Sequence, residues 1–201
     1  MLTTQNISCE KNEQILFSRL SLQLAESEVM QIKGENGCGK TSLLRILCGL
    51  AEPEKGKVLW GEKSISLQRE RYFNEMLYIG HLLGLKSGLT ARENLEMAAS
   101  NHKSFNNLTI DDALAKVNLS KRKNVFTQNL SAGQKRRVCL AKLLLVKAKL
   151  WILDEPFTAL DTLGVNLIKR FIEDHAAAGG MVIFTSHQRI DLSCSVKELD
   201  L

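Results

Sequence analysis

The segment from Gly34 to Thr41 carries residue types that could bind phosphate. It reads GENGCGKT, with glycines, a lysine and a hydroxyl at fixed spacing. Glycines let successive backbone N–H groups point into one concavity, where phosphate oxygens bind. Lys40 would place a positive charge on the β- and γ-phosphates of a nucleotide, and the Thr41 hydroxyl would coordinate Mg²⁺. The residues predicted to contact ATP here are Gly34, Glu35, Asn36, Gly37, Cys38, Gly39, Lys40, Thr41 and Ser42.

Two acids follow an apolar run much later in the chain. Asp154 and Glu155 come directly after Leu150 to Leu153, and a proline follows them. A parallel strand ends at the sheet edge where ligands bind. We therefore expect Asp154 to hold Mg²⁺ through its water shell, and Glu155 to polarise the water that attacks the γ-phosphate. The alternative, two acids that only cap a helix, does not account for the phosphate loop.

The elements around the glycine-rich segment favour a phosphate loop over an ordinary turn. Val29 to Lys33 predicts a short strand that enters the turn, and residues 40–49 predict a helix that Gly49 closes. Strand, glycine-rich turn and helix in this order are the context in which the pattern binds phosphate. Before them, residues 2–9 and 20–24 predict an antiparallel ribbon.

The rest of the chain alternates helices with buried strands. Helical periodicity marks residues 91–100, 110–118, 132–148 and 163–178. Residues 150–153 and 181–185 are apolar on both faces, which indicates a parallel sheet covered on both sides. The sequence therefore predicts an α/β fold over residues 1–201 as a single domain. It has a mostly parallel core, an N-terminal antiparallel part and a helical subdomain inserted at about 81–148.

A third motif, at residues 130–138, resembles the signature of a known protein family. Residues 130–138 read LSAGQKRRV, which resembles the LSGGQ signature of ATP-binding cassette (ABC) ATPases, with Ala132 in place of one glycine. Residues 159–161, ALD, resemble the D-loop of that family, and His187 after a strand resembles its switch histidine. The resemblance implies a P-loop NTPase fold of the ABC ATPase type. It also implies that His187 contacts the γ-phosphate and acts with Glu155 in catalysis.

The same resemblance implies a homodimer of this chain that forms when ATP binds. In the family, the signature turn of one subunit contacts ATP held by the opposite subunit. The residues expected to act in trans are Ser131, Gly133, Gln134 and Asp161.

Two positions depart from the family pattern. His81 stands where the family has a glutamine that leads into the helical insertion. We expect His81 to sense the nucleotide, although its ring offers different hydrogen-bonding groups from an amide. The family also stacks adenine on an aromatic residue in the first hairpin, and residues 9–16, CEKNEQIL, contain none.

Several segments resemble one group within the family, the ATPase subunits of cytochrome c maturation (haem exporter) systems. They are IGH at 79–81, LTARENL at 89–95, LSAGQKRRV and LWILDEPFTALD at 150–161. This resemblance implies a separate integral membrane subunit and ATP hydrolysis that drives haem export or the release of haem from a chaperone. An exporter ATPase for a peptide or lipid is the alternative, followed by an ABC protein without a transport role.

Composition limits the other possibilities. The chain has 201 residues, a net charge of +5 and five cysteines. No stretch approaches the length of a spanning helix, and the N-terminus lacks a signal-peptide pattern. We expect a peripheral protein on the cytoplasmic face of the inner (cell) membrane, with reduced cysteines in the core. The basic clusters 121–123 and 135–137 lack interleaved aromatic residues, so we expect no nucleic-acid partner.

Overall fold

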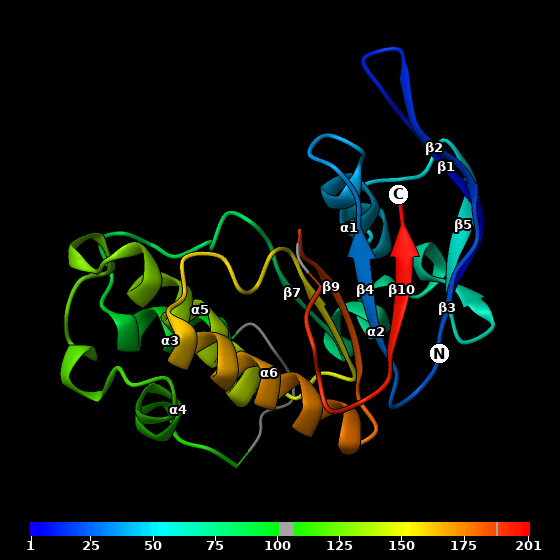
Figure 1. Ribbon diagram of the computed structural model, residues 1–201. Coiled ribbons are helices and arrows are strands. Elements are labelled where there is room, and N and C mark those ends of the chain that lie inside the picture. Colours follow the sequence, from blue (N-terminus) through cyan, green and yellow to red (C-terminus); the bar gives the residue numbers. More distant parts are fainter. Residues whose placement is uncertain (101–106, 188) are drawn as a thin grey trace.

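Two β-sheets with helices packed around them make up the computed structural model, which describes residues 1–100, 107–187 and 189–201 (Figure 1). The strands are β1 (Leu2–Lys11), β2 (Gln14–Leu20), β3 (Gln23–Leu24), β4 (Val29–Lys33), β5 (Lys55–Trp60), β6 (Lys63–Ser64), β7 (Met76–Ile79), β8 (Leu150–Leu153), β9 (Met181–Thr185) and β10 (Val196–Asp200). The α-helices are α1 (Lys40–Leu47), α2 (Arg69–Glu75), α3 (Ala91–Ser100), α4 (Ile110–Lys116), α5 (Ala132–Leu145) and α6 (Thr162–Ala177).

The central sheet is parallel, as the sequence predicts. Its strand order is β10-β4-β9-β8-β7, and each neighbouring pair runs in the same direction. The carboxyl ends of β4, β8 and β9 therefore meet at one edge. The phosphate loop follows β4, the two acids follow β8, and the predicted switch histidine follows β9. This topology brings together three motifs that are far apart in the sequence.

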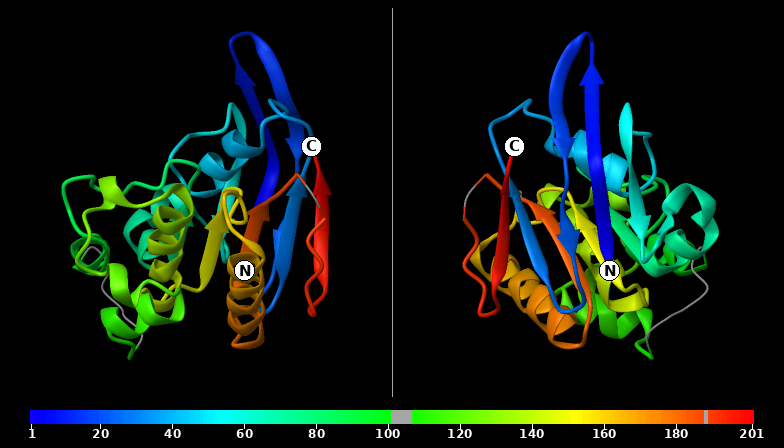
Figure 2. Two further views of the ribbon diagram at one scale, coloured as in Figure 1. Left: turned by 60° about the vertical axis from the view of Figure 1, so that its left-hand side comes forward. Right: turned by 90° about the vertical axis from the view of Figure 1, so that its right-hand side faces the viewer.

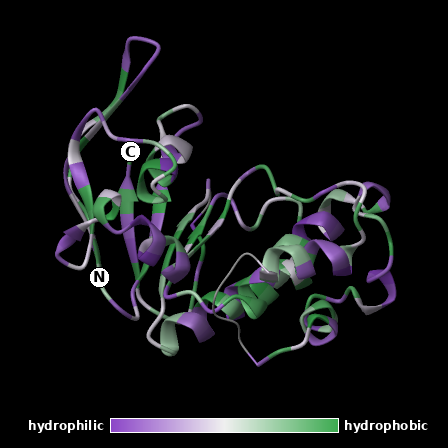
Figure 3. Ribbon diagram, turned by 180° about the vertical axis from the view of Figure 1, so that it is seen from behind, coloured by the Kyte–Doolittle hydropathy of each residue, from purple (hydrophilic) through white to green (hydrophobic). Residues whose placement is uncertain are grey.

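The hydrophobic core is divided by this sheet. Along β8, Leu150 and Ile152 pack with α1 and the antiparallel sheet, whereas Trp151 and Leu153 pack with α5 and α6. All four side chains are buried. Burying each large apolar side chain stabilises the fold by about 1.5–3 kcal/mol. In Figure 3 the hydrophobic ribbon runs through the sheet and the helix packed on it, and the tip of the β1–β2 hairpin is hydrophilic.

The second sheet is antiparallel and contains the predicted ribbon. Its order is β2-β1-β5-β6, and β3 also pairs with β1. The single strand predicted at 20–24 is in fact two, because β2 ends at Leu20 and β3 begins at Gln23. At this break Thr4 of β1 receives a hydrogen bond from the Leu22 N–H and donates one to the Leu20 carbonyl. Figure 2 shows the β1–β2 hairpin projecting beyond the parallel sheet in both views.

The helices of the predicted insertion form one group. Helices α3, α4 and α5 pack against one another to the left of the sheet in Figure 1. Residues 101–106 of the predicted range 81–148 lie outside the described part of the chain. Thr109 caps α4 with a capping box. The predicted helix 132–148 instead ends at Leu145, because Val146 is extended with φ −90° and ψ 125°.

Candidate nucleotide site

The phosphate loop is held open by glycine backbone conformations. Gly34, Gly37 and Gly39 have φ values of 143°, 87° and 110°, which lie in the region that disfavours side chains. A Cβ at Gly34 would lie 2.6 Å from Cys38 Sγ and 2.7 Å from the Leu201 carbonyl oxygen. The ammonium group of Lys40 donates to the carbonyl oxygens of Gly34 at 2.7 Å and Glu35 at 2.8 Å. The loop therefore encloses its lysine, which is 7% exposed.

Hard oxygen ligands meet where α1 begins and β8 ends. The Thr41 hydroxyl donates to Asp154 Oδ2 at 3.0 Å, and the Thr185 hydroxyl donates to Asp154 Oδ1 at 2.8 Å. A hydroxyl and a carboxylate are ligands that suit Mg²⁺, which is usually bound by one or two protein groups together with substrate phosphates. This pair fits such an ion. Among the described residues, no three or more His, Cys, Asp or Glu side chains are grouped so that they could hold a metal ion by themselves.

Glu155 stands in a cavity beside the second predicted catalytic residue. Its Oε1 lies 2.8 Å from His187 Nε2, and its Oε2 accepts a hydrogen bond from Thr158 at 3.2 Å. Its backbone N–H donates to the Thr185 hydroxyl at 2.8 Å. The cavity has a volume of about 320 Å³, and both Glu155 and His187 line it. Thr185 thus fixes both acids through one hydroxyl, a role that no sequence motif indicated.

The signature turn begins α5 with a capping box. The Gln134 N–H donates to the Ser131 hydroxyl at 3.2 Å, and the Ser131 N–H donates to Gln134 Oε1 at 3.1 Å. A Cβ at Gly133 would lie 2.8 Å from the Ala159 carbonyl, so this position requires a glycine. Asp161 caps α6 and accepts from Arg137 at 2.5 Å. The Gly164 N–H and the Arg137 guanidinium hold the pKa of Asp161 below its ordinary value.

The loop after β7 contains His81 and is held by a buried asparagine of α3. His81 is exposed. Asn94 on α3 is 1% exposed, and its side chain bonds to the backbone N–H and carbonyl of Lys86 and to the carbonyls of Leu89 and Thr90. The single side chain of Asn94 thus fixes the conformation of the loop at residues 86–90. Leu82, at the start of the loop, is 88% exposed.

A β-bulge brings an aliphatic side chain to the phosphate loop. Cys9 pairs with Phe17 and Glu10 pairs with Ile15, so Leu16 is the extra residue on β2. Bulges re-aim a side chain in this way. Leu16 Cβ lies 3.1 Å from the position of a Cβ at Gly39. No sequence motif indicates Leu16, because the family pattern has an aromatic residue in this hairpin.

Arg136 is a second residue that the sequence analysis left without a role. It is 5% exposed and donates to the backbone carbonyls of Asp154, Glu155, Pro156 and Gly80. Burial lowers the pKa of its guanidinium. One member of the basic cluster 135–137 is therefore buried inside the protein.

A family model described as ABC transporter matches residues 17–158, which include the phosphate loop, the signature turn and both acids. The chain belongs to the ABC transporter family. The expected P-loop NTPase fold of the ABC ATPase type is confirmed. A putative ABC transporter ATP-binding protein from Pyrococcus furiosus has the same fold, with a TM-score of 0.84 and 25% identity, covering 100% of this chain and 96% of that one. A bacterial ABC transporter cassette solved as a dimer gives a TM-score of 0.78 at 22% identity, over 94% and 88% of the two chains.

Two curated ABC relatives have similar sequences over nearly their whole length. The cytochrome c biogenesis ATP-binding export protein CcmA of Aliivibrio fischeri is 46% identical, over 99% of this chain and 97% of the relative. The protein of the same name from Methylococcus capsulatus is 44% identical, over 100% and 97%. The predicted similarity to the ATPase subunits of cytochrome c maturation systems is confirmed. Among the described residues, no helix is long and apolar enough to cross a membrane.

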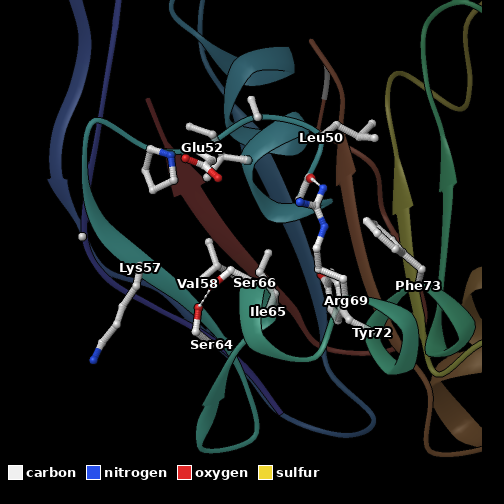
Figure 4. A pocket seen from close by; sticks show the side chains of 15 residues that line it. Leu50, Glu52, Lys57, Val58, Ser64, Ile65, Ser66, Arg69, Tyr72 and Phe73 are labelled. Atoms are coloured by element: carbon white, nitrogen blue, oxygen red, sulfur yellow. Dashed lines mark hydrogen bonds between the residues drawn. The ribbon is translucent and has the colours of Figure 1, made fainter.

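A second cavity in this ABC chain lies apart from the nucleotide motifs (Figure 4). It has a volume of about 370 Å³, and none of the residues predicted to contact ATP lines it. Its wall includes Arg69, whose guanidinium lies 5.8 Å from the ring centre of Phe73 and donates to the Gly49 carbonyl. Ser64 and Ser66 bond to each other at 2.9 Å on another part of the wall.

Proposed function

We propose that this chain is the ATP-hydrolysing subunit of an export complex in c-type cytochrome biogenesis, acting in haem export or haem release from a chaperone. The observation that carries the hydrolytic part is the pair Glu155–His187, 2.8 Å apart beside the Thr41–Asp154 contact. The names of the relatives, which are 44–46% identical over almost the full chain, support the biogenesis part.

The phosphate loop binds the triphosphate in this proposal. Backbone N–H groups of the loop and the positive end of α1 contact the phosphates, and Lys40 turns from its two carbonyl acceptors to phosphate oxygens. The residues that contact ATP are Gly34, Glu35, Asn36, Gly37, Cys38, Gly39, Lys40, Thr41 and Ser42, with His81 near the γ-phosphate. Leu16 takes the place of an aromatic residue against adenine. Mg²⁺, held by Thr41 and Asp154, would neutralise charge on the phosphate oxygens.

Glu155 activates the attacking water in the hydrolytic step. Its carboxylate accepts the proton, while His187 and Thr158 hold its two oxygens in place. His187 also contacts the γ-phosphate. Because the backbone N–H of Glu155 is bonded to Thr185, which also bonds Asp154, the base and the metal ligand keep a fixed relation.

The site is completed by a second copy of the chain. Figure 1 places the beginnings of α5 and α6 well away from α1, so the signature turn does not cover the phosphate loop of its own chain. ATP binding therefore closes a homodimer in which the second subunit contributes Ser131, Gly133, Gln134 and Asp161. A helix N-terminus with small residues suits contact with a phosphate.

Movement of the dimer is passed to an integral membrane subunit. The chain is one ABC ATPase domain over residues 1–201, with the helical subdomain at about 81–148 and peripheral attachment to the cytoplasmic face of the inner membrane. The loop from Leu82 to Leu89 is the proposed docking segment, because it lies between His81 and α3 and carries an exposed leucine. Nucleic acid has no part in this function.

Replacing Glu155 with glutamine tests the hydrolytic assignment. Glu155→Gln keeps the shape of the side chain but removes the base, so kcat should fall by about 100- to 10,000-fold while Mg-ATP still binds. Light scattering should then show a dimer trapped by ATP. Glu62→Gln, the same change at an exposed turn, is the control and should hydrolyse ATP normally. Turnover in Glu155→Gln equal to wild type would contradict the role.

Complementation tests the biological part with the same pair of variants. In Aliivibrio fischeri lacking its own relative, the wild-type chain and Glu62→Gln should restore haem-stained c-type cytochromes, and Glu155→Gln should not. Active ATPase without restored cytochromes, despite normal expression, would favour an exporter for a different substrate.

A further inference from the structure

Arg136 reaches from the first turns of α5 to the turn that follows β8. Its Nη2 donates to the Asp154 carbonyl at 2.8 Å and also to the Glu155 carbonyl. Its Nε and Nη1 donate at 3.4 Å to the carbonyls of Pro156 and Gly80. The Arg136 side chain thus contacts the backbone before, at and after Glu155, the proposed base. It also contacts the backbone of Gly80, which precedes His81.

The chemistry of this contact is specific to arginine. Four acceptors lie around one buried group, and a guanidinium presents five N–H donors in a planar fork. A lysine ammonium is a point charge with three donors and cannot reach four carbonyls in the same way. The acceptors are neutral carbonyls, so the contact fixes backbone position.

The turn that Arg136 contacts has an unfavourable backbone conformation. Glu155 has a φ of 48°, in the left-handed region, which is unfavourable for a non-glycine residue. Such a conformation persists only where the surroundings enforce it. The carbonyl contacts from Arg136 and the Thr185 bond to the Glu155 N–H are the restraints on the two sides of this residue.

Two neighbouring contacts attach the same part of α5 to the chain after Pro156. Gly133 packs against the Ala159 carbonyl, and Arg137 bonds to Asp161. The start of α5 and the segment from 154 to 161 are therefore joined at three places. A displacement of the helix would move the Glu155 backbone with it.

Building on the proposed function, we propose that Arg136 is a positioning residue for hydrolysis: it sets the backbone turn that aims the Glu155 carboxylate, from the helix that carries the signature turn. Arg136 touches neither ATP nor water in this role. Its loss misplaces the base without removing it.

Kinetics of Arg136→Ala and Arg136→Lys in the full chain test this role. Because a misplacement of about 1 Å costs up to roughly 100-fold in rate, kcat of Arg136→Ala should fall by about 10- to 100-fold. The calorimetric Kd for Mg-ATP should change by less than about 3-fold, which is under 1 kcal/mol. Lys147→Ala, which removes an exposed lysine just beyond the same helix, is the control and should keep both values.

Chemical rescue separates positioning from general stability. Millimolar guanidinium chloride should refill the vacated site in Arg136→Ala and raise its kcat several-fold, with no such rise in wild type or Lys147→Ala. A normal kcat in folded Arg136→Ala would overturn the proposal, as would a lower kcat that guanidinium does not raise and that follows a fall in Tm. If Arg136→Ala does not fold, Arg136→Lys decides: a lower kcat at unchanged Kd supports the role, and a normal kcat overturns it. Absence of ATPase activity in wild type would instead refute the proposed function itself.

Discussion

At the scale of single residues, the lysine of the phosphate loop bonds to the backbone of its own loop. Lys40 donates to two carbonyls of its own loop, at 2.7 and 2.8 Å. Phosphate oxygens would replace these neutral acceptors with charged ones, and charge-assisted hydrogen bonds are roughly twice as strong. The hydrogen bonds of Lys40 should therefore become stronger when its acceptors are phosphate oxygens.

Lys40→Ala should therefore weaken ATP binding strongly. Losing a hydrogen bond to a charged group costs about 1.5–3 kcal/mol, which corresponds to roughly a 10- to 150-fold higher Kd. Calorimetric titration with Mg-ATP measures the change, with Lys63→Ala at an exposed position on β6 as control. Equal Mg-ATP affinity in both variants would remove Lys40 from the site.

At the scale of elements, the bulge in β2 decides which hairpin side chain faces the nucleotide loop. Leu16 is the unpaired residue of the bulge and contacts Gly39, whereas Ile15 is 67% exposed. An aliphatic side chain offers contact area without the ring stacking of an aromatic residue.

Leu16→Ala should weaken ATP binding but not triphosphate binding. Removing the apolar contact with adenine should cost about 1–2 kcal/mol, or roughly 5- to 30-fold in the Kd for Mg-ATP. Competition by inorganic triphosphate should be unchanged, since it lacks the base. Equal weakening of both ligands would mean that the substitution disturbs the phosphate loop and not an adenine contact.

Helix α6 is attached to the sheet by a stacked aromatic pair. The rings of His175 and Trp151 lie 3.8 Å apart with an interplanar angle of 4°. Burial lowers the pKa of His175 to about 4 from its ordinary 6.5. The unfolded chain therefore binds a proton at His175 more readily than the folded chain does. Well above pH 6.5 neither state is protonated there, so His175 does not change the free energy of unfolding. As the pH falls from 6.5 toward about 4, protonation of the unfolded chain increasingly lowers the free energy of unfolding.

His175→Phe should remove this pH dependence while keeping the stack. Between pH 7 and pH 5, the free energy of unfolding of wild type should fall by about 2 kcal/mol more than that of His175→Phe. Urea denaturation of both proteins at the two pH values measures the difference. Parallel losses in the two proteins would show that other groups control acid stability.

Three strands have the same first and last residues in the structure as in the sequence prediction, and all three are buried on both faces. Val29–Lys33, Leu150–Leu153 and Met181–Thr185 are continuous apolar or nearly apolar runs with sharp ends. The edge strand β10 (Val196–Asp200) was missed, because it is partly exposed and carries three charges in five residues. The phosphate loop follows from residue types alone. The Leu16 contact depends on strand register and the Arg136 contacts on tertiary packing, neither of which a local pattern reveals.

At the scale of the whole molecule, Leu82 lies in the segment that connects β7 of the parallel sheet to helix α3. Asn94 fixes the loop from 86 to 90 by four hydrogen bonds to its backbone. Leu82 precedes this fixed part of the loop and is 88% exposed. In the proposed function, this leucine is an apolar contact to the membrane subunit.

Leu82→Ser should weaken association with the membrane subunit and leave the ATPase of the isolated chain intact. Co-purification from detergent-solubilised native membranes measures the first property, and phosphate release measures the second. Leu67→Ser is the control, because Leu67 is 82% exposed but lies in a different part of the fold. Equal recovery of the partner with both variants would place the docking surface elsewhere.

The left-handed backbone at Glu155 has a consequence for how this protein responds to selection. Glycine would adopt the φ of 48° without strain, so Glu155→Gly would remove a local cost of about 1–2 kcal/mol. The extra backbone freedom of glycine in the unfolded chain offsets about 0.5–1 kcal/mol of this gain. A screen for heat resistance alone would therefore reward the loss of this carboxylate. Any programme that evolves a more robust version of the chain needs an activity step at every round, or it will enrich stable molecules that no longer turn over.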